Sequence, residues 1–218
     1  GENIMEDNYD IINNASKYWL IDPLDGTKSF ISSDGDYTIN IALIIDNKPV
    51  YGFIYAPIND VLYYTNSDIA AVKVKNAQDN YNELGNNRFH QLINVQPINY
   101  DAVKIVASKS HNTKETDDFN QYFANAELIS AASSIKLCLV AEGKADIYPR
   151  FGPTMEWDIG AGHAILNAAG GKIIALDKEF VMAQNINFYD ELRYGKETLL
   201  NGNFIAASKN FFRDICNQ

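Results

Sequence analysis

Tyr18-Trp-Leu-Ile-Asp22 and the adjoining Pro23-Leu-Asp-Gly-Thr27 form the most informative stretch of this chain. The apolar run predicts a buried strand, which Pro23 ends because proline donates no backbone hydrogen bond. Asp22 and Asp25 then stand three positions apart at the end of the strand, where their carboxylates can converge on one point. Carboxylate oxygens suit Mg²⁺, Mn²⁺ or Ca²⁺ better than zinc. The stretch therefore predicts either a metal site or an ordinary turn in which the two aspartates cap the next helix.

The other groups of this turn fit the metal interpretation. Because Pro23 fixes the backbone, the carbonyl of Leu24 is free to face the point on which the carboxylates converge. Gly26 permits a tight turn. Thr27 places a hydroxyl and an amide beside whatever the metal holds.

A second acidic segment occurs at Trp157-Asp-Ile-Gly-Ala-Gly162. The pattern predicts a helix over 158–169, with Asp158 at its N-terminus, where the helix dipole attracts anions. Its first residues are small enough for a phosphate to approach the backbone closely. The alternative is that Asp158 only caps the helix and that the glycines only help the helix to pack on a sheet.

The remaining segments predict sheets layered with helices, in an α/β or α+β fold. Runs rich in β-branched and aromatic residues predict an antiparallel meander, and alternating helices and strands follow it. A serine is expected to cap the second of these helices. We expect an N-terminal half, 1–100, and a C-terminal half, 101–218, in one compact unit. The predicted strands are 38–45, 50–56, 61–65, 103–107, 127–130, 145–148 and 172–176, and the predicted helices are 113–124, 133–142 and 158–169.

The composition excludes several classes of protein. The chain has 218 residues, 46% of them hydrophobic, and a net charge of −10, which argues against a nucleic-acid polymer or an anionic membrane as the main partner. Two cysteines, Cys138 and Cys216, are too few for a disulfide framework, and no apolar run is long enough to span a membrane. We expect a reducing cytoplasm, no disulfide partner, and Cys138 in the core.

Taken together, the two acidic segments resemble the paired motif of the inositol monophosphatase-like superfamily of Mg²⁺-dependent, lithium-sensitive phosphatases. Residues 18–28, followed by Phe30-Ile31, are similar to the bacterial 3′(2′),5′-bisphosphate nucleotidases within it. The resemblance implies a layered αβαβα sandwich whose N-terminal helices are missing from this chain. Further matching segments are Ser108-Lys-Ser-His111, Ser133-Ser-Ile-Lys136, Tyr148-Pro-Arg-Phe-Gly-Pro153 and Tyr194-Gly-Lys196.

The resemblance also implies roles for individual residues. Glu2, twenty residues before Asp22, joins Thr27 and Asp25 as groups that position or deprotonate the attacking water. Two or three Mg²⁺ ions are expected, with Mn²⁺ as a substitute and Ca²⁺ and Li⁺ as inhibitors. The implied metal ligands are Glu2, Asp22, the carbonyl of Leu24, Asp25 and Asp158. The residues expected to bind substrate are Asp25, Gly26, Thr27, Lys28, Ser108, Ser110, His111, Ser133, Lys136, Arg150, Asp158 and Lys196.

Lys136, Arg150 and Lys196 are the candidates to hold a second phosphate of the substrate, although each is equally compatible with a solvated surface charge. The resemblance implies a phosphoric monoester hydrolase that releases the 3′-phosphate of adenosine 3′,5′-bisphosphate to give AMP. The alternatives are the same chemistry on inositol monophosphate or fructose 1,6-bisphosphate, and a non-catalytic protein that binds metal or nucleotide. The sequence leaves open a monomer or a homodimer, and the free cytoplasm or loose attachment to a bacterial inner membrane.

Overall fold

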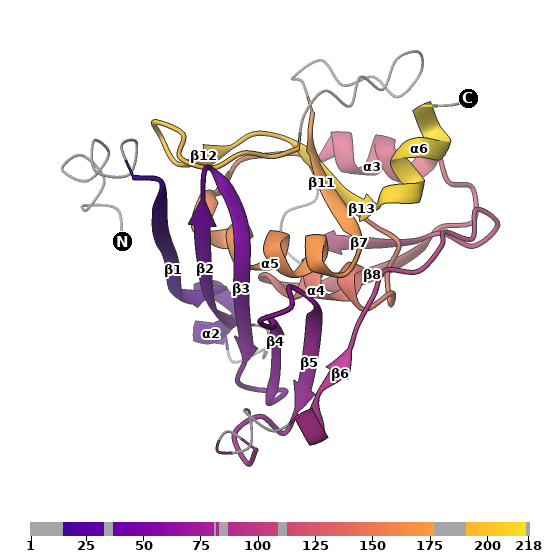
Figure 1. Ribbon diagram of the computed structural model, residues 1–218. Coiled ribbons are helices and arrows are strands. Elements are labelled where there is room, and N and C mark those ends of the chain that lie inside the picture. Colours follow the sequence, from indigo (N-terminus) through magenta and orange to yellow (C-terminus); the bar gives the residue numbers. More distant parts are fainter. Residues whose placement is uncertain are drawn as a thin grey trace.

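Two β-sheets with a pair of helices between them make up the body of the structure. The structure is a computed structural model, and it describes residues 15–32, 37–80, 82, 87–108, 113–176 and 191–216. A further pair of helices lies on the far side of the second sheet, so the layers run sheet, helices, sheet, helices (Figure 1). This layered α+β arrangement is the fold class expected from the sequence.

The first sheet is an antiparallel meander whose six strands pair in sequence order. Asp46 and Asn47 join two of them in a tight hairpin, and both have the positive φ, 49° and 62°, that such a turn requires. The predicted meander is confirmed, and further strands extend it. The strands are β1 (Lys17–Asp25), β2 (Thr38–Ile45), β3 (Lys48–Ala56), β4 (Val61–Thr65), β5 (Ala71–Lys75) and β6 (Gln91–Leu92).

Strand β1 differs from the prediction in two respects. Among the described residues it pairs with β2 alone and forms the edge of the sheet, and Trp19 and Ile21 on its outer side are more than half exposed. It also continues through Pro23 to Asp25, with a shift of register between Asp22 and Asp25. An edge strand tolerates proline because the missing N–H need not meet a neighbour. The prediction of a buried strand that ends at Pro23 was therefore wrong.

The second sheet contains both parallel and antiparallel pairs. Strand β7 runs parallel to both of its neighbours, β8 and β9, whereas β13 is antiparallel to β9 and β11. The predicted strands of this region occur with shifts of one or two residues. In spatial order the strands of this sheet are β11 (Gly171–Ala175), β13 (Phe204–Ser208), β9 (Ile147–Arg150), β7 (Lys104–Ser108) and β8 (Glu127–Ala131). Two further strands, β10 (Thr154–Met155) and β12 (Leu200–Asn201), pair with each other outside both sheets. A single 3₁₀ turn, η3, covers Asn87–Phe89.

The helices fill the space between the sheets and cover the second one. The predicted cap of the second helix was wrong: α4 begins at Ile135, and the Ser134 hydroxyl makes no capping hydrogen bond because it points to Asp25 instead. The third predicted helix begins two residues early, at Glu156. The helices are α2 (Thr27–Ser32), α3 (Lys114–Gln121), α4 (Ile135–Ala141), α5 (Glu156–Ala168) and α6 (Lys209–Cys216).

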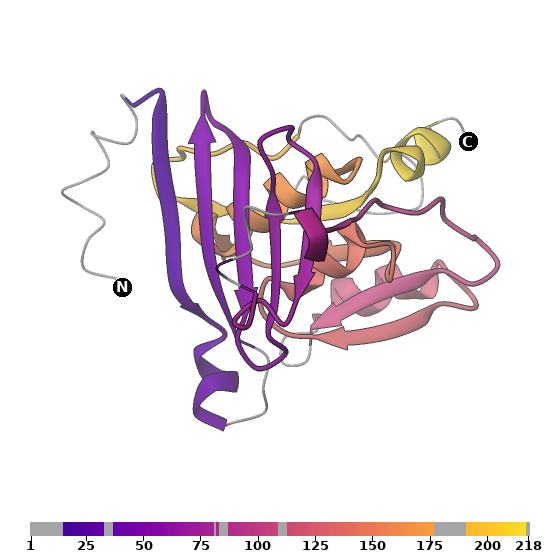
Figure 2. The same ribbon diagram turned by 60° about the horizontal axis from the view of Figure 1, so that its bottom comes forward.

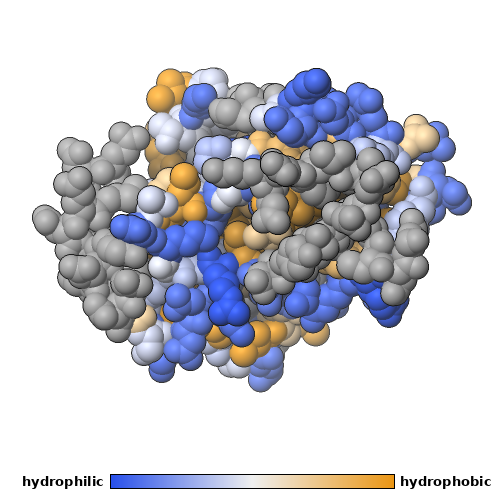
Figure 3. Space-filling view, turned by 90° about the horizontal axis from the view of Figure 1, so that it is seen from above, coloured by the Kyte–Doolittle hydropathy of each residue, from blue (hydrophilic) through white to orange (hydrophobic). Residues whose placement is uncertain are grey.

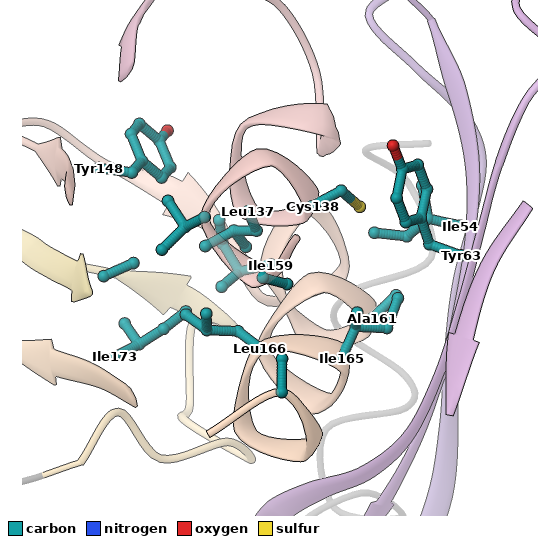
Figure 4. Packing of buried hydrophobic residues seen from close by; sticks show 14 of the residues in the cluster. Ile54, Tyr63, Leu137, Cys138, Tyr148, Ile159, Ala161, Ile165, Leu166 and Ile173 are labelled. Carbon is teal, nitrogen blue, oxygen red and sulfur yellow. The ribbon is translucent and has the colours of Figure 1, made fainter. Parts of the chain in front are cut away.

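The main core lies where α4 and α5 meet the two sheets (Figure 4). The fully buried Cys138 faces Ile54 and Tyr63 of the first sheet, as expected for a core cysteine, while Leu166 of α5 lies toward Ile173 of the second sheet. A second core, built around Phe119 and other buried aromatic residues, joins α3 and α6 to the outer face of the second sheet.

Glycines allow α5 to approach its neighbours closely. A Cβ atom on Gly52 of β3 would lie 2.2 Å from the carbonyl oxygen of Ala161, and one on Gly162 would lie 2.5 Å from Cδ1 of Leu137. The small residues of α5 therefore serve helix packing, which was the alternative interpretation of the Gly160 and Gly162 pair.

The outer face of the first sheet carries apolar side chains, including Trp19, Ile21 and Ile39. Figure 2 shows no helix over β1 and β2 on this side within the described part of the chain. That the N-terminal helices are missing from this chain stays a prediction, as does the division into halves at residue 100. On the face seen from above in Figure 3, hydrophilic and hydrophobic residues both reach the surface among the coloured atoms. None of the helices described here is long and apolar enough to cross a bilayer.

We predict that Gly52→Ala destabilises the protein by about 1 to 3 kcal/mol, because the new methyl group must displace the backbone of α5 from β3. The free energy of unfolding, measured in urea, checks this. Gly202→Ala is the matched control, since a Cβ at Gly202 meets nothing within 4 Å. Equal stability of both variants would contradict the close packing.

Candidate active site

Three aspartates from distant parts of the chain meet at one end of α5. Asp22 and Asp25 come from the irregular end of β1, and Asp158 from the first turn of α5. Each offers a carboxylate oxygen that lies within 4.8 Å of the other two. We call these three residues the acidic triad. The structure thus brings together the two acidic segments that the sequence pairs.

Hydroxyl groups at the start of α4 hold Asp25 in place. Oδ2 of Asp25 lies 2.5 Å from Oγ of Ser133 and 2.8 Å from Oγ of Ser134. The Ser134 hydroxyl is also 2.9 Å from the carbonyl oxygen of Asp158, and it has one hydrogen to donate to either acceptor. Asn40, buried on β2, donates to Ser134 Oγ across 2.8 Å. Asp25 and the first turn of α5 are therefore joined through the same serine.

Hydrogen bonds within residues 22–27 hold the turn at the end of β1. The amide of Leu24 donates to Oδ1 of Asp22 across 3.0 Å, and the Leu24 carbonyl oxygen lies 3.4 Å from Oγ1 of Thr27. Gly26 has a φ of 91°, in the region that side chains with a Cβ rarely adopt. This conformation turns the chain back into α2, with Thr27 as the first helical residue.

The acidic triad holds unbalanced negative charge. Burial raises the pKa of Asp158 to about 6; the hydrogen bond from the Met155 amide opposes this, and the charges of Asp25 and Asp22 add to it. The pKa of Asp22 is raised as well, mainly by burial. A cation between the three carboxylates would remove the repulsion that adds to both pKa shifts. With oxygen donors alone, the triad fits a hard divalent ion.

A cavity of about 250 Å³ adjoins the triad. Three basic residues also line it, Lys28, Lys136 and Arg150, and we call these three the basic wall. Lys136 is almost fully buried, and its Nζ lies 5.6 Å from the ring centre of Tyr148. Of the residues predicted to bind substrate, those that line this cavity are Asp25, Gly26, Thr27, Lys28, Ser133, Lys136, Arg150 and Asp158.

The other predicted site residues lie elsewhere or outside the described part of the chain. Lys196 does not line the cavity, because its ammonium binds Glu156, Asn201 and the carbonyl of Arg193. The backbone of Ser108 belongs to β7. Glu2, Ser110 and His111 fall outside the described residues.

Sequence reasoning missed several polar groups of the site. Ser134 was only part of a matching segment. Thr38 and Asn40 alternate with isoleucines along β2, and two polar residues on the buried face of a strand are the signal that could have identified them. Glu156, which adjoins the acidic motif, was missed as well. It is fully buried and is the first residue of α5, whereas the sequence placed the start of this helix two residues later.

A larger cavity, of about 650 Å³, lies beside the C-terminal half of α5, lined in part by Lys48, Lys172 and Glu191. It contains none of the predicted site residues. The smaller cavity is the better candidate because it adjoins the acidic triad and is lined by predicted site residues.

Comparison with known proteins places this chain in a family. The model of the inositol monophosphatase family matches residues 2–217. The chain is 44% identical over 157 residues to the 3′(2′),5′-bisphosphate nucleotidase CysQ of Salmonella typhimurium, and 42% identical to that of Escherichia coli K12, each match covering 72% of this chain. The matched region spans 58% of the length of these relatives.

Solved structures agree. CysQ from Bacteroides thetaiotaomicron, described as a bacterial member of the inositol monophosphatase family, superposes with a TM-score of 0.75 and 41% identity, over 92% of this chain and 73% of that one. An inositol monophosphatase from Anabaena, 24% identical over 94% of this chain and 71% of its own, has a TM-score of 0.67, which shows the same fold. This chain belongs to the inositol monophosphatase family.

Proposed function

We propose that the protein is a divalent-metal-dependent phosphatase that releases the 3′-phosphate of adenosine 3′,5′-bisphosphate to give AMP and phosphate. The observation that carries this proposal is a cavity that adjoins three clustered carboxylates and is also lined by three cations. An anion alone would be repelled by the triad, and a cation alone would not need the basic wall. A phosphate ester that binds together with metal ions uses both.

The acidic triad and the Leu24 carbonyl would hold Mg²⁺, with Mn²⁺ as a substitute and Ca²⁺ and Li⁺ as inhibitors. Glu2 would add a further carboxylate. When bound, such ions neutralise phosphate oxygens and lower the pKa of a coordinated water. The serine hydroxyls keep Asp25 oriented, so that its second oxygen can face the ion. Thr27, with Glu2, would orient the attacking water by hydrogen bonds of about 3 Å.

The basic wall would hold the substrate. Lys28 lies in the helix that follows the triad's turn and would face the phosphate that leaves, whereas Lys136 and Arg150 would hold the phosphate that stays. Lys196 is not needed for this role, since its charge is already paired with Glu156. The two curated relatives support the choice of a bisphosphate nucleotide, because both are named 3′(2′),5′-bisphosphate nucleotidases. A cytoplasmic location is part of the proposal.

Phosphate release in Mg²⁺ from adenosine 3′,5′-bisphosphate, inositol 1-phosphate and fructose 1,6-bisphosphate, each at the same concentration, tests the choice of substrate. We expect the nucleotide to give the highest kcat/KM. Preference for either sugar phosphate would overturn the choice. If none is hydrolysed while the nucleotide still binds in Mg²⁺, the protein is a binder and the proposed activity falls.

Lys136→Met tests the basic wall. We predict that kcat/KM for adenosine 3′,5′-bisphosphate falls about 10- to 100-fold, the usual cost of losing a charged hydrogen bond, while kcat/KM for 3′-AMP changes little. Lys209→Met, at the exposed start of α6, is the control. Equal losses on the two substrates would show that Lys136 does not hold the second phosphate.

Proton and metal should compete for the acidic triad. The pKa of Asp158 in the folded, metal-free protein, about 6, lies above its ordinary value, so the folded state gains stability from the proton at low pH and loses it as pH rises from about 4 through 6. We predict that the metal-free protein loses about 2 to 3 kcal/mol of unfolding free energy over this interval. Asp158→Asn should remove most of the loss, and Mg²⁺ at pH 7.5 should offset it in the wild type only.

Urea denaturation in a chelator, and again with saturating Mg²⁺, measures both effects. Asp118→Asn, on the exposed side of α3, should behave like the wild type. A decline with pH that persists unchanged in Asp158→Asn, or equal stabilisation of that variant by Mg²⁺, would remove Asp158 from the metal site.

A further inference from the structure

We propose that Glu156, paired with Lys196, is a positioning residue that sets the orientation of Asp158 and thereby the metal affinity of the acidic triad. The inference deepens the proposed function and rests on its metal site, although not on the choice of substrate. Glu156 is the first residue of α5 and lies two positions before Asp158, yet it faces away from the cavity. Its proposed role depends on the groups that its carboxylate binds, which belong to residues 195 and 196.

The carboxylate of Glu156 is completely buried, and the backbone of a distant segment satisfies it. Oε2 accepts the amide of Gly195 across 2.9 Å, and Oε1 accepts the amide of Lys196 across 3.0 Å. Nζ of Lys196 returns to Oε1 at 3.1 Å. The amide of Glu156 itself donates to the carbonyl of Leu199 across 2.8 Å. One glutamate thus fastens residues 195–199 to the start of α5.

The same lysine extends the network to the strand before α5. Nζ of Lys196 donates to Oδ1 of Asn201 across 2.8 Å, and Nδ2 of Asn201 donates to the Met155 carbonyl at 3.3 Å and to Oγ1 of Thr154 at 3.4 Å. Strands β10 and β12 also pair here, Thr154 with Asn201 and Met155 with Leu200. The peptide unit around Met155 is therefore held from both sides.

Met155 connects this network to the site. Its amide donates to Oδ2 of Asp158 across 2.8 Å, and this bond is the strongest influence that favours the charged form of that carboxylate. If Met155 moves, Asp158 loses the donor that restrains its rotation. A metal ligand whose side chain is already oriented by a second residue binds the ion more tightly, because it loses less conformational entropy on binding. The chain of contacts runs from Glu156 through Lys196, Asn201 and Met155 to Asp158.

The ion pair also keeps a fourth negative charge from acting on the triad. Glu156 lies two residues before Asp158 in the same helix, and the ammonium of Lys196 pairs with its carboxylate. A buried ion pair by itself is weak evidence of stabilisation, since well-packed apolar residues often replace one without loss. The bond from Lys196 to Asn201, which in turn binds the Met155 carbonyl, accounts for a charged pair where an apolar contact could have packed.

The test measures Mn²⁺ binding by calorimetry at a temperature where each variant is folded, alongside kcat and KM. Glu156→Gln removes the charge and one amide acceptor, and we expect it to weaken Mn²⁺ binding about 10- to 100-fold, as loss of an outer-shell partner typically does. Lys209→Met should bind as the wild type, and Asp158→Asn should not bind. Unchanged Mn²⁺ affinity in folded Glu156→Gln overturns the proposal.

A second variant covers the case in which Glu156→Gln fails to fold. In Glu156→Met combined with Lys196→Met, the apolar pair is expected to restore folding but not the bonds to residues 195, 196 and 201. Weakened Mn²⁺ binding in this folded double variant supports positioning, and wild-type binding overturns it. If the wild type binds Mn²⁺ but hydrolyses no phosphate ester, the proposed activity falls while the positioning role stands on the binding data.

Discussion

The close contact of α5 with its neighbours is the constraint on which the site depends. Gly52 lets the helix backbone touch β3, and Gly162 lets it touch Leu137 of α4. With the helix pressed against both, its N-terminus can end at only one place, beside the irregular end of β1. Asp158 therefore reaches Asp22 and Asp25 because of close packing at two glycines outside the site. Packing in the core thus sets the short distances between the three carboxylates, which repel one another.

That repulsion explains why so many donors surround the site. Ser133, Ser134 and the amide of Met155 each bond a carboxylate of the triad, and Asn40 in turn bonds Ser134. Such bonds favour the charged form of an acid, whereas burial disfavours it. For Asp158 burial prevails and the pKa stays raised. The protein thus holds the carboxylates in place without cancelling their charge, which is the state that a divalent cation would complete.

The sequence predicted the meander, the alternating second half and the pairing of the two acidic segments, because hydrophobic periodicity and turn residues are local signals. It failed where tertiary contacts decide. Pro23 lies inside β1 because that strand is at an edge, which the residues alone do not show. Ser134 gives up a helix cap to bond Asp25, more than a hundred residues away. The pairing of Lys196 with Glu156 depends likewise on how two distant segments meet.

The acidic triad and the basic wall share an element. The triad lies where β1 and α5 meet the residues that precede α4, because Ser133 and Ser134 bind Asp25. The basic wall comes from α2, α4 and β9, through Lys28, Lys136 and Arg150. Because Ser134 directly precedes α4 and Lys136 lies in the first turn of that helix, a shift of α4 would disturb the triad and the basic wall together.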